Sequence, residues 1–201
     1  DRTRLLAREM SSAMAKKNAR RPGGQPRINP ADRDTIALFS YGFRPFFLGA
    51  AIWAVAALLL WIGWLQGYVS IAASYGAPPW HGHEMLFGYA AGVVAGFLLT
   101  AVPNWTGRLP VAGVRLMALF GLWCLGRAAL LATGVIGPLS GAVIDSAFLP
   151  CLLIVMGREI VVGENWRNLM PLGLLAILAL SNIVFHVEVL SGGSPAYGLR
   201  G

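Results

Sequence analysis

Five stretches of this 201-residue chain are both apolar and long enough to cross the hydrocarbon core of a lipid bilayer. A transmembrane α-helix needs about 20 predominantly apolar residues. The chain is 56% hydrophobic and only 12% charged, and a water-soluble domain of this size could not bury so much apolar surface. We therefore predict an all-α fold, a polytopic transmembrane helical bundle whose domain covers residues 46–201, with spans near residues 46–65, 83–103, 111–132, 142–162 and 169–190.

Positive charge is concentrated ahead of the first span. The formal net charge is +7, and ten of the sixteen Lys and Arg residues lie within residues 1–45. This segment also holds a Pro- and Gly-rich run at residues 21–30, so we expect a basic, disordered tail that stays in the cytoplasm. No aromatic residue precedes Phe39 to stack on a base, and we expect no nucleic-acid partner.

The connections between the spans predict the orientation of the bundle. Residues 66–82 and 133–141 carry no charged side chain, whereas the other two connections carry two arginines each: Arg108 and Arg115, then Arg158 and Arg167. Cytoplasmic loops of membrane proteins are enriched in Lys and Arg. The alternation places the N-terminus and both arginine-bearing loops in the cytoplasm.

All three histidines of the chain are predicted to lie at a similar depth in the membrane, together with several other polar residues. His81, His83 and Glu84 begin the second span, and His186 lies near the end of the fifth, one helical turn after Asn182. The third and fourth spans contribute Arg127 and Asp145. With the predicted orientation, all seven residues lie toward the outer leaflet. A charge near the membrane centre costs about 2.5–3.5 kcal/mol on insertion scales, so such a group calls for an explanation.

Two interpretations of this group are open. Neutral imidazole is a common metal ligand, so His81, His83 and His186 are candidate ligands for a metal or a haem. Glu84 then orients a ligand, Arg127 pairs with Asp145 or with a haem propionate, and Asn182 shares the helical face of His186. Alternatively, these side chains simply reach the wet interface, and an H-x-H pair alone is a weak metal signal.

Two further features predict helix geometry. Gly88, Gly92 and Gly96 form a stripe of small residues at a spacing of four, which allows a neighbouring helix to approach closely. Pro150 predicts a kink in the fourth span, because proline cannot donate the backbone hydrogen bond of an α-helix.

Three unusual strings flank the first two spans. Residues 43–47 read FRPFF, residues 80–88 read WHGHEMLFG, and residues 96–107 read GFLLTAVPNWTG. Together they resemble the NnrS family of bacterial membrane proteins, and the resemblance runs from about Ser40 to the C-terminus.

This resemblance implies a multi-pass protein of the bacterial inner membrane that contains haem and copper. It further implies a role in the nitric oxide response, nitrosative-stress resistance or denitrification, with the lipid bilayer, haem, copper and nitric oxide as partners. The family's W-H-x-H-E-M string falls on residues 80–85, which makes His81 and His83 ligand candidates. We also expect the chain to be the N-terminal half of a larger bundle, since its number of spans is odd.

A second hypothesis comes from a different functional class. The same ionisable residues could line a polar path through a cofactor-free transporter or permease-like bundle. Such proteins show inverted repeats and discontinuous helices, and Pro150 is one weak sign of the latter. Stoichiometric haem in the purified protein separates the two hypotheses.

Overall fold

A computed structural model describes residues 37–71, 75–192 and 198–200. Within these ranges all regular structure is helical, and five helical segments are long and apolar enough to cross a membrane. This confirms the predicted all-α polytopic bundle. The predicted basic tail lies, up to residue 36, outside the described residues.

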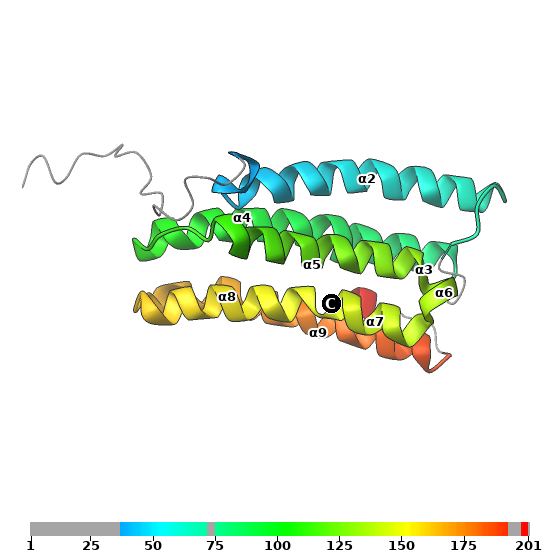
Figure 1. The fold of residues 1–201 in the computed structure, drawn as a ribbon. Coiled ribbons are helices and arrows are strands. Elements are labelled where there is room, and N and C mark those ends of the chain that lie inside the picture. The colour runs from blue at the N-terminus through cyan, green and yellow to red at the C-terminus, as the bar shows by residue number, and fades with distance from the viewer. Residues whose placement is uncertain (1–36, 72–74, 193–197, 201) are drawn as a thin grey trace, which may run out of the picture.

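The spans are built from the following elements (Figure 1). The first span is α2 (Phe43–Leu65), preceded by the short η2 (Ala37–Ser40), and the third is α5 (Gly113–Leu131). The second span consists of α3 (Ala77–His83), η3 (Glu84–Ala90) and α4 (Ala91–Thr106). The fourth consists of α7 (Pro138–Ser146) and α8 (Phe148–Val162), and the short α6 (Thr133–Ile136) precedes it. The fifth consists of η4 (Trp166–Asn168) and α9 (Leu169–Leu190), and the short η5 (Gly198–Arg200) follows it.

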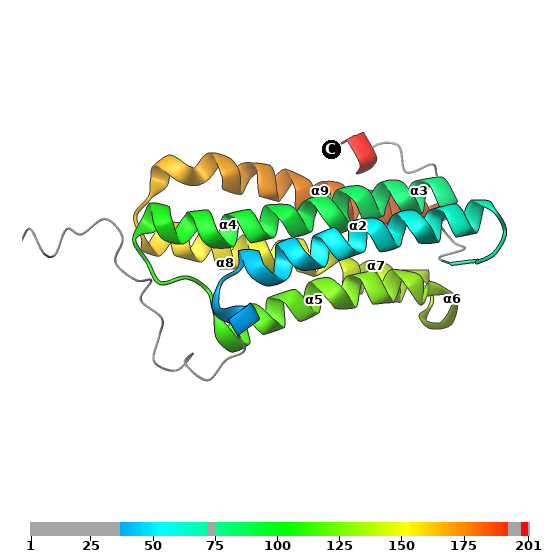
Figure 2. The same cartoon turned by 90° about the horizontal axis from the view of Figure 1, so that it is seen from above.

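The second span is the central element of the bundle. Helix α4 packs against α2 on one side and against α8 on the other, while α5 packs against α7 and α8 against α9. Figure 1 shows α2 on the opposite side of α4 from α8 and α9, and Figure 2 shows α2 and α9 on either side of α4. The second span is also the most buried of the five. Its residues therefore have neighbours on several sides and can contribute to an internal site.

The outer surface of the bundle is apolar, as a bilayer requires. Helix α2 exposes Ile52, Val55 and Leu59 by more than half of their surface. Exposing such side chains to water is unfavourable, whereas lipid tails are as apolar as the side chains themselves.

The glycine stripe of the second span packs against α2, as predicted. A Cβ at Gly92 would lie 3.2 Å from Ala50 Cβ, and one at Gly96 would lie 2.7 Å from the ring of Phe47. Because these positions lack a Cβ, the two helices approach closely, which holds the second span in place against the first.

Two spans are less regular than an uninterrupted α-helix. The second begins at Ala77, six residues before the predicted start, and changes to a π-helix over Glu84–Ala90. The fourth is divided between Ser146, where α7 ends, and Phe148, where α8 begins. Pro150 accounts for this break, because it has no N–H to donate to the carbonyl of Ser146 four residues earlier. The break, at Ala147, comes two residues after Asp145.

Candidate metal centre

Six of the seven predicted site residues converge between four spans. They come from α3 and η3 (His83, Glu84), α5 (Arg127), α7 (Asp145) and α9 (Asn182, His186). All six are buried, with at most 5% of their surface exposed. The bundle thus gathers polar side chains that are far apart in the sequence into one internal cluster, which we call the polar cluster.

The carboxylate of Asp145 is the centre of the polar cluster. Its Oδ2 atom lies 3.2 Å from His83 Nε2 and 2.9 Å from His186 Nε2. Asn182 donates a hydrogen bond to the same oxygen at 3.1 Å, and its own Oδ1 lies 2.9 Å from His83 Nε2. The other carboxylate oxygen of Asp145 accepts a hydrogen bond from Arg127 Nη2. Asp145 was a predicted partner of Arg127, and the structure adds its contact with both imidazoles.

His83, Asp145 and His186 offer one ligand atom each, and these three atoms lie within 4.8 Å of one another. Bonds from zinc to imidazole nitrogen or carboxylate oxygen are about 2.0–2.2 Å long, so donors around one ion lie about 3–4 Å apart. The distances of 3.2 and 2.9 Å from Asp145 Oδ2 to the two imidazole nitrogens are close to this separation. Two imidazoles and one carboxylate form a donor set that suits copper, zinc or iron.

The second nitrogen of each imidazole also faces a specific group. His83 Nδ1 lies 3.4 Å from Glu84 Oε1, and His186 Nδ1 lies 3.1 Å from the hydroxyl of Tyr75. In metal sites such outer partners fix the tautomer and the orientation of the ligating ring. Burial, and secondarily the charge of Glu84, raises the pKa of Tyr75 to about 12, so its hydroxyl stays neutral at physiological pH.

Tyr75 and Trp53 also belong to this environment, and no sequence pattern indicated either of them. Tyr75 lies in the uncharged connection before the second span, where hydropathy predicts no buried role. Trp53 lies on α2 and donates a hydrogen bond from Nε1 to Glu84 Oε2 at 2.7 Å. An aromatic residue in an apolar helix gives no signal of such a contact, because the contact depends on how α2 is rotated against η3.

The π-helix starts at the polar cluster itself. His83 ends α3 and Glu84 begins η3, and both side chains are completely buried although they are adjacent in the chain. π-helical turns are rare and occur frequently at functional sites. The local change in helical winding therefore coincides with the point at which two consecutive polar side chains enter the interior.

Charge in the polar cluster is unbalanced. Arg127 contacts both acids, with Nη1 3.3 Å from Glu84 Oε2 and Nη2 paired with Asp145. Two carboxylates face one guanidinium, so the cluster holds one excess negative charge when both imidazoles are neutral. An uncompensated charge is costly in a buried site, and a cation or an additional proton removes this cost.

Gly88 provides the space that Arg127 and Glu84 occupy. A Cβ at this position would lie 2.5 Å from Arg127 Nη1 and 2.6 Å from Glu84 Oε2. The backbone carbonyl of Gly88 accepts a hydrogen bond from Trp123 Nε1 at 3.0 Å, which holds this turn against α5. The first glycine of the stripe thus makes room for the ion pair as well as for helix packing.

We expect Gly88→Ala to lower the free energy of unfolding by about 1–3 kcal/mol, the usual cost of overpacking a well-packed interior. The measurement is denaturant-induced or thermal unfolding of the purified protein in detergent. Gly121→Ala is the matched control, because a Cβ at Gly121 on α5 meets no atom within 4 Å. Equal stability of the two variants would show that the polar cluster adapts to the added methyl group.

His81 is the one predicted ligand that lies apart from the polar cluster. Its imidazole stacks on the indole of Trp61, with ring centroids 4.1 Å apart and an interplanar angle of 9°. Its Nδ1 atom is buried and has no hydrogen-bond partner among the described residues. In a helix, His81 and His83 are two positions apart and point in different directions, so the H-x-H pair does not act as one unit.

An apolar groove of about 350 Å³ reaches the polar cluster from the outer surface of the bundle. It lies between α7 and α9 and is lined by His186 together with exposed apolar side chains such as Leu139, Val143 and Val187. The imidazole of His186 therefore contacts Asp145 inside the bundle, and the same residue also lines a groove on the lipid-facing surface.

Comparison with known proteins gives one match. The family model described as "NnrS protein" matches residues 37–201, which is most of the chain. No curated protein and no solved structure matched the chain. Because the family match covers well over half of the sequence and includes all of the helical bundle, the chain belongs to the NnrS family.

Proposed function

We propose that this protein is a membrane metalloprotein of the nitric oxide response, in which His83, Asp145 and His186 bind one copper ion. The observation that carries the proposal is geometric. Both imidazoles direct Nε2 to the same carboxylate oxygen, and all three ligand atoms are buried and within 4.8 Å of one another. The link to nitric oxide is supported by membership of the NnrS family.

The charge of the polar cluster supports a cation at this point. Glu84 and Asp145 exceed the charge of Arg127 by one unit, and a copper ion between the three ligands supplies the missing positive charge. His186 then binds through Nε2, and its Nδ1–H donates to the hydroxyl of Tyr75. Glu84 Oε1 lies 3.4 Å from Nδ1 of His83 and offers that nitrogen a negative charge to face.

The haem that the family resemblance implies does not fit between the two imidazoles of the polar cluster. Their ring centroids are 5.0 Å apart and their planes meet at 51°, which leaves no room for a porphyrin between them. His81 lies apart from the polar cluster, and its buried Nδ1 has no hydrogen-bond partner among the described residues. We therefore propose His81 as the histidine of this chain that faces the haem.

Three protein ligands leave room for a further ligand on the ion, as in catalytic metal sites. A copper ion bound there supplies one-electron redox chemistry and a coordination position for a small molecule. The groove beside His186 supports access for an uncharged diatomic such as nitric oxide, because its lining is apolar and open to the lipid side. Asp145 and Arg127 meanwhile keep the ligand set in a fixed arrangement.

The alternative of a cofactor-free transporter uses the same residues as a polar path. It does not require two imidazoles to share one carboxylate oxygen while each second nitrogen faces its own partner. That arrangement is typical of a metal site, and for this reason we favour the metalloprotein.

Metal analysis and an optical spectrum of the full-length natural protein test the proposal. After expression with sufficient copper and haem, we expect about one copper per polypeptide in this site, together with a Soret band. Protein that is folded but free of both copper and haem would contradict the metalloprotein and support the transporter hypothesis.

A further inference from the structure

The end of the bundle remote from the polar cluster carries a second, unrelated feature. A pocket of about 700 Å³ lies where α4 ends, α5 begins and α8 ends. Figure 1 shows that these helix ends lie opposite the end that holds α3 and α7. Among the described residues, its lining includes Arg108, Arg115 and Arg158, and Glu159 is the one acid. Three guanidinium groups against one carboxylate leave the pocket with a net charge of two positive units.

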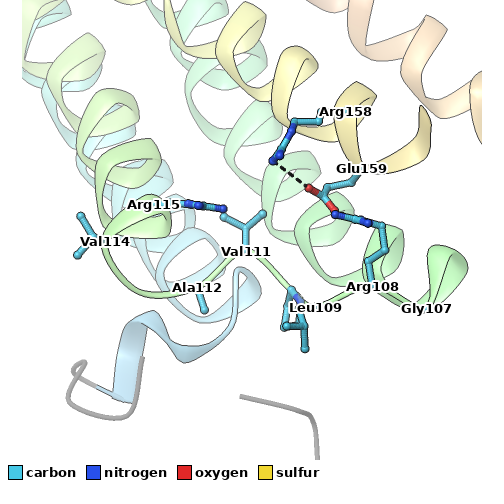
Figure 3. Close-up of a pocket in the computed structure, with 10 residues that line it drawn as sticks. Gly107, Arg108, Leu109, Val111, Ala112, Val114, Arg115, Arg158 and Glu159 are labelled. Carbon is cyan, nitrogen blue, oxygen red and sulfur yellow. Dashed lines mark hydrogen bonds and ion pairs between the residues drawn. The ribbon is translucent and has the colours of Figure 1, made fainter. Parts of the chain in front are cut away.

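The arginines of this pocket differ in how far they are neutralised (Figure 3). Glu159 accepts a hydrogen bond from Arg108 Nε at 2.5 Å, and its other oxygen lies 3.7 Å from Arg158 Nη1. Arg115 is exposed and forms no ion pair with any residue in the described part of the chain. In Figure 3, Arg115 extends from α5 into the space on the side of α8. The carboxylate of Glu159 is thus shared between Arg108 and Arg158, and Arg115 has no carboxylate partner among the described residues.

An apolar groove continues from this charged pocket along the membrane-facing surface. The groove has a volume of about 420 Å³ and shares Val111, Arg115, Arg158 and Glu159 with the pocket. Its other lining residues, from α5 and α8, are all apolar: Ala118, Leu119, Leu122, Cys151, Ile154 and Val155. The cationic pocket at the membrane boundary is therefore continuous with an apolar groove between α5 and α8.

We propose that this combined site binds one anionic phospholipid, with the phosphate headgroup at Arg108, Arg115 and Arg158 and an acyl chain in the groove between α5 and α8. Basic pockets between transmembrane helices on the cytoplasmic side are suited to anionic headgroups. The positive-inside pattern places this end at the cytoplasmic leaflet. The excess positive charge favours an anion, and the adjoining apolar groove favours an anion that carries a hydrocarbon chain over a free one. This proposal is independent of the metal site.

The test measures which lipid stays on the full-length protein. The protein is reconstituted in nanodiscs of phosphatidylcholine and phosphatidylglycerol, extracted into mild detergent, and analysed by native mass spectrometry for retained lipid. We expect selective retention of one phosphatidylglycerol. Arg115→Gln and Arg158→Gln should each lower this selectivity by about fivefold, and Arg115→Lys should keep it, because one cation near the surface contributes about that factor.

Two matched controls separate a built site from general attraction. Arg167→Gln removes a cation at the same end of the bundle, but Arg167 does not line the pocket. This variant should therefore keep the selectivity of the protein for phosphatidylglycerol. Ala118→Trp fills the apolar groove and should reduce lipid retention, whereas Ile177→Trp on the exposed surface of α9 should not.

Three results would overturn the proposal. The first is equal retention of the two phospholipids, and the second is an equal loss of selectivity in Arg167→Gln and Arg115→Gln. The third is displacement of the lipid by soluble glycerophosphoglycerol at equal concentration, because the apolar groove then contributes nothing and the pocket binds a free phosphate ester.

Discussion

We expect His83→Ala to lose the copper proposed for this site, and His81→Ala to keep it. His83 places Nε2 3.2 Å from Asp145 Oδ2, within reach of the ion proposed for this site, while His81 is stacked on Trp61. Loss of an outer partner of a metal ligand costs about 10–100-fold in affinity, so loss of the ligand itself should cost more than about 100-fold. The measurement is a copper titration of each purified variant against a competing chelator.

Tyr75→Phe is the graded control in the same titration. It keeps the ring of residue 75 but removes the hydroxyl that faces His186 Nδ1, so we expect a loss within the 10–100-fold range of an outer partner. The Soret band supplies a second readout, because His81→Ala should weaken it while the copper content stays constant. Copper loss in His81→Ala combined with normal copper in His83→Ala would refute this assignment of ligands.

Arg127→Met destabilises the folded protein by about 3–5 kcal/mol, because it leaves two buried carboxylates without a counter-charge. Arg127 is 5% exposed and contacts both Glu84 and Asp145, which are themselves completely or almost completely buried. Methionine matches the side chain of arginine as far as about Nε, so the change removes mainly the guanidinium group. Unfolding in detergent, followed by circular dichroism, measures the effect.

Arg108→Met is the matched control for this prediction. Arg108 also pairs with a glutamate, Glu159, but its side chain is 34% exposed. Ion pairs that water can reach contribute about 0–1 kcal/mol, so the loss should be correspondingly small. Similar stabilities of the two variants would mean that Glu84 and Asp145 do not carry charge in the folded protein. The polar cluster would then have no excess negative charge to attract a cation.

Much of the fold follows from the sequence, because the hydrophobic effect and helical hydrogen bonding act locally. A span of about 20 apolar residues is favourable in the bilayer whatever its neighbours are, since each helix satisfies its own backbone groups. The five spans, the packing role of Gly92 and Gly96, and the break ahead of Pro150 were predictable for this reason. The resemblance carried by residues 80–88 likewise indicated the NnrS family, which the family match confirms.

The composition of the polar cluster was only partly predictable. Position along the spans indicated that His83, Glu84, Arg127, Asp145, Asn182 and His186 share one level of the membrane, and the structure brings these six together. The depth of a residue in the membrane does not determine the direction in which its side chain points, however. His81 has the same level and residue type as His83, but it faces Trp61 instead of Asp145.

Hydropathy and charge pattern alone thus determined that this chain is a five-span bundle with scarce ionisable groups gathered toward one end. The tertiary structure decided which of these groups touch: it placed Asp145 between two imidazoles, separated His81 from them, and added Tyr75 and Trp53. The physical reason is that insertion into a bilayer depends on a sum of local transfer free energies. A ligand set depends on the rotation of each helix about its axis, which is decided by close packing between helices and here by a π-helical turn at Glu84.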